Sequence, residues 1–193
     1  LVRQLLRLFG VKTDPNTHIL SVHEEIVGAL ELGRQEGIVE KEHRDRLLGA
    51  LDLNERNVEE VMLHRSEIEM INASDPPKKI ISQCLESSHS RIPVFKGEPE
   101  NIIGVLHTKD LLRTLETRFI ANQKENSSLN KFSITKVIRK PYFVPETTTL
   151  DDQMRQFLKK RTHFALVVDE YGALQGLITL EDILEEIVGE ISD

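Results

Sequence analysis

An internal repeat constrains the fold of this chain more than any other feature of its sequence. Residues 86–112 align without a gap on residues 158–184. Self-similarity of this length indicates two copies of one structural unit, at about residues 56–116 and 132–193. The alignment pairs residues of the same kind: Gly104 with Gly176, Asp110 with Asp182, and Leu111-Leu112 with Ile183-Leu184.

Each copy has the hydrophobic pattern of a β-α-β-β-α unit. Short apolar runs bounded by Gly, Pro and polar residues predict strands, and apolar residues at helical spacing predict helices. A three-stranded sheet with two helices buries only one face, so we expect the two copies to pack together in an α/β (α+β) fold. The predicted strands are 68–71, 92–95, 102–106, 142–144, 165–168 and 174–178, and the predicted helices are 78–86, 110–115, 150–160 and 181–188, the last of them acidic.

The first 55 residues differ in character and predict a short helical segment that precedes the repeats. Ser21 and Glu24 have the spacing of a capping box, and a second helix is expected at 41–51. The amphipathic pattern of residues 1–9 suits a membrane surface or another helix, and both interpretations stay open. The polar residues 117–131 predict a linker between the two copies.

Composition restricts the classes of function. The 193 residues carry 25 Lys and Arg against 32 Asp and Glu, a net charge of -7, so we expect no nucleic-acid partner. The lone Cys84 cannot close an internal disulfide and is predicted to be a small core residue. No apolar run approaches the roughly 20 residues of a transmembrane helix, and the N-terminus has no signal-peptide pattern. We interpret the chain as a piece of a longer protein.

One strand-to-helix turn carries residues suited to ligand binding. Residues 176–182 leave the hydroxyl of Thr179 and the carboxylate of Asp182 at a helix N-terminus. The free N–H groups and the positive dipole end attract a phosphate, Thr179 adds a donor, and Asp182 can accept from the two hydroxyls of a ribose. The same spacing is that of a capping box, which by itself explains both residues. We find no phosphate-binding glycine loop, zinc-spaced Cys/His set or nucleophile elbow, so no enzyme is expected.

These motifs resemble a known family. The two units resemble a pair of CBS repeats, the Bateman module, over about residues 56–191. More narrowly, the run that includes Val167-Val-Asp-Glu-Tyr-Gly172 and residues 176–190 is similar to the CorB/CorC and CNNM group. Residues 1–55 resemble that group's helical connector, which follows a transmembrane domain. The marker positions of the repeats are Val61-Met62, Ser90-Arg-Ile-Pro-Val94 and Gly176 to Asp182.

The resemblance implies a cytosolic regulatory domain at the cytoplasmic face of a membrane protein for magnesium or cobalt transport or efflux. It implies binding of ATP, ADP or AMP with Mg2+, a homodimer of CBS pairs whose rearrangement gates transport, and an N-terminal transmembrane domain in the same protein. Thr179 would hold phosphate and Asp182 the ribose. Mg2+ would bind through the nucleotide, near Glu181, with no direct protein ligand. The base and sugar would be bordered by Arg65, Ile68, Arg91, Ile92 and Pro93.

The sequence departs from the family pattern in the first repeat. His107 occupies the position that Thr179 holds in the second repeat, and Pro93 is matched by Ala165. We therefore expect one competent nucleotide site. His107 either faces a phosphate when protonated or is a hydrogen-bonded surface residue. The alternative function is a soluble CBS-pair scaffold or adenine-nucleotide sensor that regulates another protein without transport.

Overall fold

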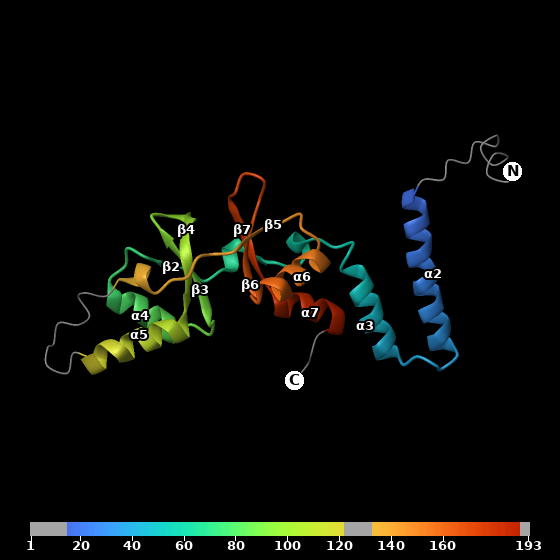
Figure 1. Cartoon of the computed structure of the whole chain (residues 1–193), viewed down its shortest axis with the longest axis horizontal. Helices are drawn as coiled ribbons and strands as arrows, with labels where there is room; N and C mark the ends of the chain where they lie inside the picture. Colours follow the sequence, from blue (N-terminus) through green and yellow to red (C-terminus); the bar gives the residue numbers. More distant parts are fainter. Residues whose placement is uncertain (1–14, 122–132, 190–193) are drawn as a thin grey trace. The chain divides into compact units, whose positions relative to one another are not determined.

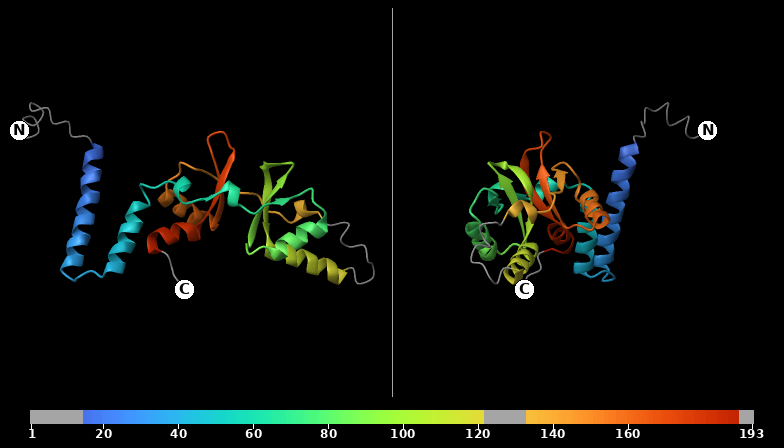
Figure 2. Two further views of the ribbon diagram at one scale, coloured as in Figure 1. Left: turned by 180° about the vertical axis from the view of Figure 1, so that it is seen from behind. Right: turned by 60° about the vertical axis from the view of Figure 1, so that its left-hand side comes forward.

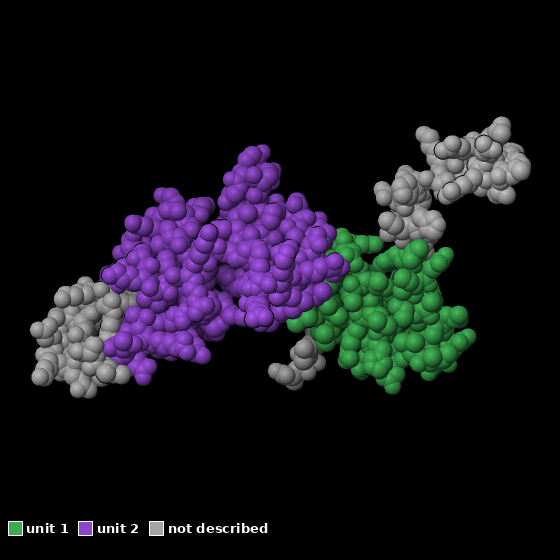
Figure 3. All heavy atoms as spheres, viewed as in Figure 1, with its two compact units in different colours: residues 1–56, 183–193 green, residues 57–182 purple. Residues whose placement is uncertain are grey.

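The computed structural model describes residues 15–121 and 133–189, which belong to two compact units (Figure 3). The first unit consists of residues 1–56 and 183–193, and the second of residues 57–182. The amphipathic residues 1–9 and most of the predicted linker lie outside the described residues. Within the described ranges, no helix is both long enough and apolar enough to cross a bilayer.

The first unit contains two helices side by side, α2 (Pro15–Gln35) and α3 (Lys41–Asp52), together with the end of α7 (Leu180–Val188) (Figures 1 and 2). Arg44 of α3 joins Glu31 of α2 through an ion pair of 2.5 Å. A Cβ added to Gly49 would lie 2.6 Å from the carbonyl oxygen of Glu186, so α3 and α7 approach closely at this glycine. The predicted cap at Ser21 is wrong, because α2 begins at Pro15 and Ser21 lies inside it.

The second unit contains both repeats except for the part of α7 after Asp182, and each repeat has the predicted order of strands and helices. The fold class is confirmed. In the first repeat, β2 (Ile71–Asn72), β3 (Arg91–Lys96) and β4 (Glu98–His107) form a sheet, with α4 (Pro77–Glu86) and α5 (Thr108–Ala121) beside it (Figures 1 and 2). In the second repeat the matching elements are β5 (Phe143–Pro145), α6 (Leu150–Lys160), β6 (Phe164–Val168), β7 (Leu174–Thr179) and α7.

The second sheet differs from the prediction because it has four strands. Its order is β1-β7-β6-β5, and the added strand β1 (Leu63–His64) comes from the chain before the first repeat's own sheet. In return, Arg139, which precedes the second repeat's sheet, forms a β-bridge with Val105 of β4. The segment that leads into each repeat therefore pairs with the sheet of the other. The strand predicted at 68–71 lies later in the chain, at Ile71–Asn72. Residues Arg65–Glu67, just before the predicted strand, form a 3-10 helix.

Two apolar clusters hold the second unit together. One is centred on the first repeat, where Ile80 and Cys84 of α4 pack against β3 and β4, and it includes Ile134 from the segment that leads into the second repeat. Cys84 is buried, as predicted, and burial raises the pKa of its thiol to about 11, so it is a protonated core residue. The other cluster joins the two repeats, and its buried members are Ile68, Val105, Phe164, Leu166 and Leu174.

Candidate functional site

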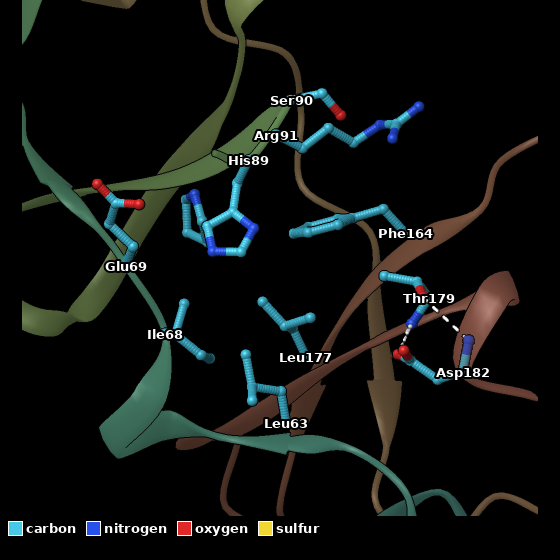
Figure 4. A pocket seen from close by; sticks show the side chains of 11 residues that line it. Leu63, Ile68, Glu69, His89, Ser90, Arg91, Phe164, Leu177, Thr179 and Asp182 are labelled. Atoms are coloured by element: carbon cyan, nitrogen blue, oxygen red, sulfur yellow. Dashed lines mark hydrogen bonds between the residues drawn. The ribbon is translucent and has the colours of Figure 1, made fainter. Parts of the chain in front are cut away.

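A cavity of about 270 Å³ lies between the two repeats (Figure 4). Its walls are mainly apolar, and its polar groups gather at two separate ends. Thr179 and Asp182 stand at one end, and Glu69 and His89 stand across from them, with Leu177 between. Ser90 and Arg91 also line it. The apolar lining residues are Leu63, Ile68, Pro93, Phe164 and Leu177.

The end at Thr179 and Asp182 is the junction of β7 and α7. The backbone N–H of Thr179 donates to Asp182 Oδ2 at 2.7 Å, and the backbone N–H of Asp182 donates to Thr179 Oγ1 at 3.2 Å. These reciprocal bonds are a capping box. A hydroxyl that accepts a bond keeps its own hydrogen for donation, and a carboxylate has a second oxygen. Both residues can therefore cap the helix and bind a ligand at the same time.

The opposite end is organised by Ser87. Its hydroxyl donates to Glu69 Oε2 at 2.6 Å and accepts the backbone N–H of His89 at 3.1 Å. Ser87 thus joins the side chain of Glu69 to the backbone of His89.

The structure brings five of the eight predicted site residues to this cavity: Ile68, Arg91, Pro93, Thr179 and Asp182. Arg91 and Pro93 share one face of β3, because side chains alternate along a strand. Ile92 lies on the other face, is 1% exposed, and belongs to the core of the first repeat.

The remaining two predicted residues lie elsewhere. Arg65 donates from Nη1 to the carbonyl oxygen of Leu174 at 3.5 Å. Glu181 lines a separate hollow of about 430 Å³, together with Arg161 and His163. The structure therefore does not bring Arg65, Ile92 or Glu181 into the lining of the first cavity.

Six lining residues were not predicted: Leu63, Glu69, His89, Ser90, Phe164 and Leu177. Ser90 belongs to the marker run 90–94, and Phe164 begins a strand that was predicted from residue 165. The sequence carried a signal for both. Leu63 reaches the cavity only because β1 joins the other repeat's sheet, and no local pattern shows that exchange.

Arg91 also forms a contact between the repeats. Its Nη2 donates a hydrogen bond to Nε2 of His163, which occupies the matching position of the second repeat. The contact places Arg91 at the edge of the cavity on the side of Thr179 (Figure 4).

The matching turn of the first repeat has different partners. The carboxylate of Asp110 accepts from Nε of Arg139 at 2.7 Å and also pairs with its Nη2. His107 is half-buried, and burial lowers the pKa of its imidazole, with the charges of Arg139 and Arg91 lowering it further. His107 is therefore neutral at neutral pH, which opposes its interpretation as a protonated phosphate ligand.

Comparison with known proteins agrees with this geometry. The family described as "CBS domain" matches residues 58–117 and 134–189. A magnesium and cobalt efflux protein CorC from Pasteurella multocida is 36% identical over 174 residues, which are 90% of this chain and 55% of that protein. The chain thus spans about half the length of this relative.

Solved structures give the same result. The CBS domain of a bacterial CNNM/CorC family Mg2+ transporter superimposes with a TM-score of 0.75 at 31% identity, covering 88% of this chain and 98% of that one. A CBS domain of a bacterial CNNM/CorC family Mg2+ transporter solved in complex with ATP gives a TM-score of 0.66 at 33% identity, covering 76% and 97%. This chain belongs to the CBS-domain proteins of the CorC/CNNM family of magnesium transporters.

Proposed function

We propose that this chain is a regulatory CBS-pair domain that binds one adenine nucleotide, ATP with Mg2+, in the cavity between its repeats. The main support for this proposal is the cavity, where a helix N-terminus with Thr179 and Asp182 faces apolar walls supplied by both repeats. The complex of a related CBS domain with ATP supports this assignment. The absence of enzyme motifs in the sequence agrees with a regulatory role.

The groups present suit the parts of a nucleotide. The flat base fits between the apolar side chains, and Asp182 is an acceptor for ribose hydroxyls. Thr179, the helix N-terminus and the guanidinium of Arg91 offer donors and positive charge for phosphates. A cavity of about 270 Å³ is small for a whole triphosphate, so we expect it to enclose the nucleoside and leave the outer phosphates beside Arg91.

Mg2+ would arrive with the nucleotide. The described residues contain no group of three or more His, Cys, Asp or Glu side chains placed to hold a metal ion. Mg2+ keeps several waters and binds readily through substrate phosphates, so it needs few protein ligands here. Glu181 lines the other hollow, and the geometry gives no support to its contact with the metal.

Titration calorimetry with ATP and Mg2+ tests the nucleotide proposal. Asp182→Ala removes the ribose acceptor, and Thr179→Val removes a phosphate donor while keeping the side chain's shape. We expect each variant to bind ATP at least tenfold more weakly, as for the loss of a hydrogen bond to a charged group. Omitting Mg2+ should weaken binding as well, because the phosphate charges would be less screened.

Thr149→Val is the matched control. Thr149 caps α6 of the same repeat by accepting the backbone N–H of Asp152 at 3.3 Å, and it does not line the cavity. Loss of this helix cap in Thr149→Val should lower the free energy of unfolding by about 1 kcal/mol and leave the affinity for ATP unchanged. If all three variants bind ATP as the wild type does, Thr179 and Asp182 are helix caps only.

We also propose that the second unit pairs into a homodimer. Three leucines on its helices are exposed in the isolated chain: Leu85 by 64%, Leu112 by 48% and Leu158 by 64%. Apolar side chains at this degree of exposure gain stability when a second copy covers them. Light scattering should show a dimer that Leu85→Glu or Leu158→Glu weakens, whereas Tyr171→Glu, at an exposed turn, should leave it intact. A monomer at every concentration would contradict the dimer.

The role of the whole protein is proposed from the relatives. We propose that residues 1–55 connect the CBS pair, on the cytoplasmic face, to a transmembrane domain that moves magnesium or cobalt. A nucleotide could gate such a domain only by binding one arrangement of the dimer more tightly than another. Several hydrophobic spans in the reading frame upstream of Leu1 would support this role, and their absence would favour a soluble sensor or scaffold.

A further inference from the structure

We propose that nucleotide binding at the N-terminal end of α7 stabilises the packing of α3 against the other end of α7. The residues that couple the two events are Gly49, Arg56 and Glu186. This inference rests on the proposed function, because it assumes that a nucleotide binds at Thr179 and Asp182. It adds the segment of the chain that responds to binding and the contact through which the response occurs.

Helix α7 takes part in both compact units of the chain. Its residues up to Asp182 belong to the second unit, and its residues from Ile183 onward belong to the first unit, together with α3. The helix has nine residues, so its ends lie roughly 13 Å apart at a rise of 1.5 Å per residue. The ligand turn and the part of α7 that packs in the first unit are therefore joined by continuous helix.

The contact between α7 and α3 leaves little room for independent movement of the two helices. A Cβ added to Gly49 would lie 2.6 Å from the carbonyl oxygen of Glu186 and 3.0 Å from Cα of Ile187. Closely packed interfaces change between discrete arrangements and do not deform gradually. A displacement of α7 must therefore be followed by α3 or must break this contact.

An ion pair holds the same contact. Nη1 of Arg56, in the segment that follows α3, pairs with Oε2 of Glu186. The two side chains are partly shielded from water, with 35% and 31% of their surface exposed. Helix α7 has no basic residue in its own last turn, so Arg56 supplies positive charge near the end of the helix that favours it.

A bound nucleotide would restrain the first turn of α7. It would use the hydrogen of the Thr179 hydroxyl and the second carboxylate oxygen of Asp182, which are left over from the capping box. Coupling between two sites is reciprocal. Packing of α3 on α7 and binding of the nucleotide should therefore strengthen each other.

Hydrogen exchange of the whole chain, with and without saturating ATP and Mg2+, tests this coupling. In the wild type, ATP should slow exchange about fivefold or more both at residues 176–183 and in α3. Glu186→Gln removes the ion pair, and Gly49→Ala forces the two backbones apart. Each variant should keep the slowing at residues 176–183 and lose most of it in α3.

Titration calorimetry checks the reciprocal effect. Both variants should bind ATP about two- to fivefold more weakly, as for the loss of a partly shielded ion pair. Glu185→Gln is the matched control, because it makes the same charge change on the preceding residue of α7, whose side chain is exposed. It should keep the wild-type exchange pattern and the wild-type affinity.

The outcomes separate this inference from the proposed function. If ATP binds and protects residues 176–183 but leaves exchange in α3 unchanged, the coupling is overturned and the proposed function stands. The same conclusion follows if ATP slows exchange in α3 equally in the wild type, Glu186→Gln and Gly49→Ala, because that is general stabilisation of the fold. If calorimetry detects no nucleotide binding to the wild type, both fail.

Discussion

Two glycines explain how the repeats fit together at the scale of single residues. Gly104 and Gly176 occupy matching positions, and each meets the segment that crosses from the other repeat. A Cβ on Gly176 would lie 2.5 Å from the carbonyl oxygen of Leu63, and a Cβ on Gly104 would lie 2.7 Å from Cδ1 of Ile138. The glycine at this position of each repeat is therefore required by the close approach of the exchanged segment.

Gly176→Ala and Gly104→Ala should each destabilise the protein by about 1–3 kcal/mol, because the added methyl group overlaps a neighbouring segment. Urea unfolding followed by circular dichroism measures the change. Gly28→Ala, in helix α2, is the control, because a Cβ added there has no neighbour within 4 Å. We expect this substitution to stabilise the helix slightly. Equal stability of the wild type and Gly176→Ala would show that the close contact with β1 is not present in solution.

The hairpin between β6 and β7 is an element whose turn depends on one carboxylate. Asp169 Oδ1 accepts the backbone N–H groups of Ala173 at 2.8 Å and Tyr171 at 3.0 Å, and Oδ2 accepts from Nε2 of Gln175 at 2.8 Å. The bond from Ala173 is the main reason that the pKa of Asp169 lies below its usual value. The ionised side chain therefore stabilises the folded hairpin.

The sign of the pH dependence follows from this depressed pKa. The stabilisation is fully present above the unfolded pKa of about 4 and is lost as the pH falls through the lower, folded pKa. Asp169→Asn should lower the free energy of unfolding at pH 7 and reduce its further loss below about pH 4. Urea unfolding across this range measures both effects. Glu170→Gln, in the same turn, should retain the wild-type pH dependence, and parallel curves for wild type and Asp169→Asn would contradict this role.

Local patterns predicted the elements of each repeat well, because the strands are short apolar runs, the helices have helical periodicity, and Thr149 and Thr179 cap α6 and α7. Helix α6 has the predicted bounds. The exchange of β1 was not predictable, because Leu63–His64 pairs with a strand more than 100 residues away in the sequence and carries no signal of its partner. For the same reason the sequence indicated Thr179 and Asp182 but not Leu63 or Glu69, whose place in the cavity depends on long-range packing.

At the scale of the whole molecule, the two repeats are alike in fold and unlike in their turns. In the second repeat, Asp182 faces the cavity, whereas in the first repeat Asp110 is paired with Arg139 and His107 is neutral. An aspartate that is already neutralised by an internal guanidinium is a poor acceptor for ribose hydroxyls. The proposal therefore assigns the two repeats to one nucleotide site.

The stoichiometry of ATP binding, measured by titration calorimetry in the presence of Mg2+, tests this account most directly. We predict one ATP per chain, bound at Thr179 and Asp182. Two molecules per chain, or one molecule whose binding is lost in Asp110→Ala and kept in Asp182→Ala, would contradict the assignment of the site to the second repeat's turn.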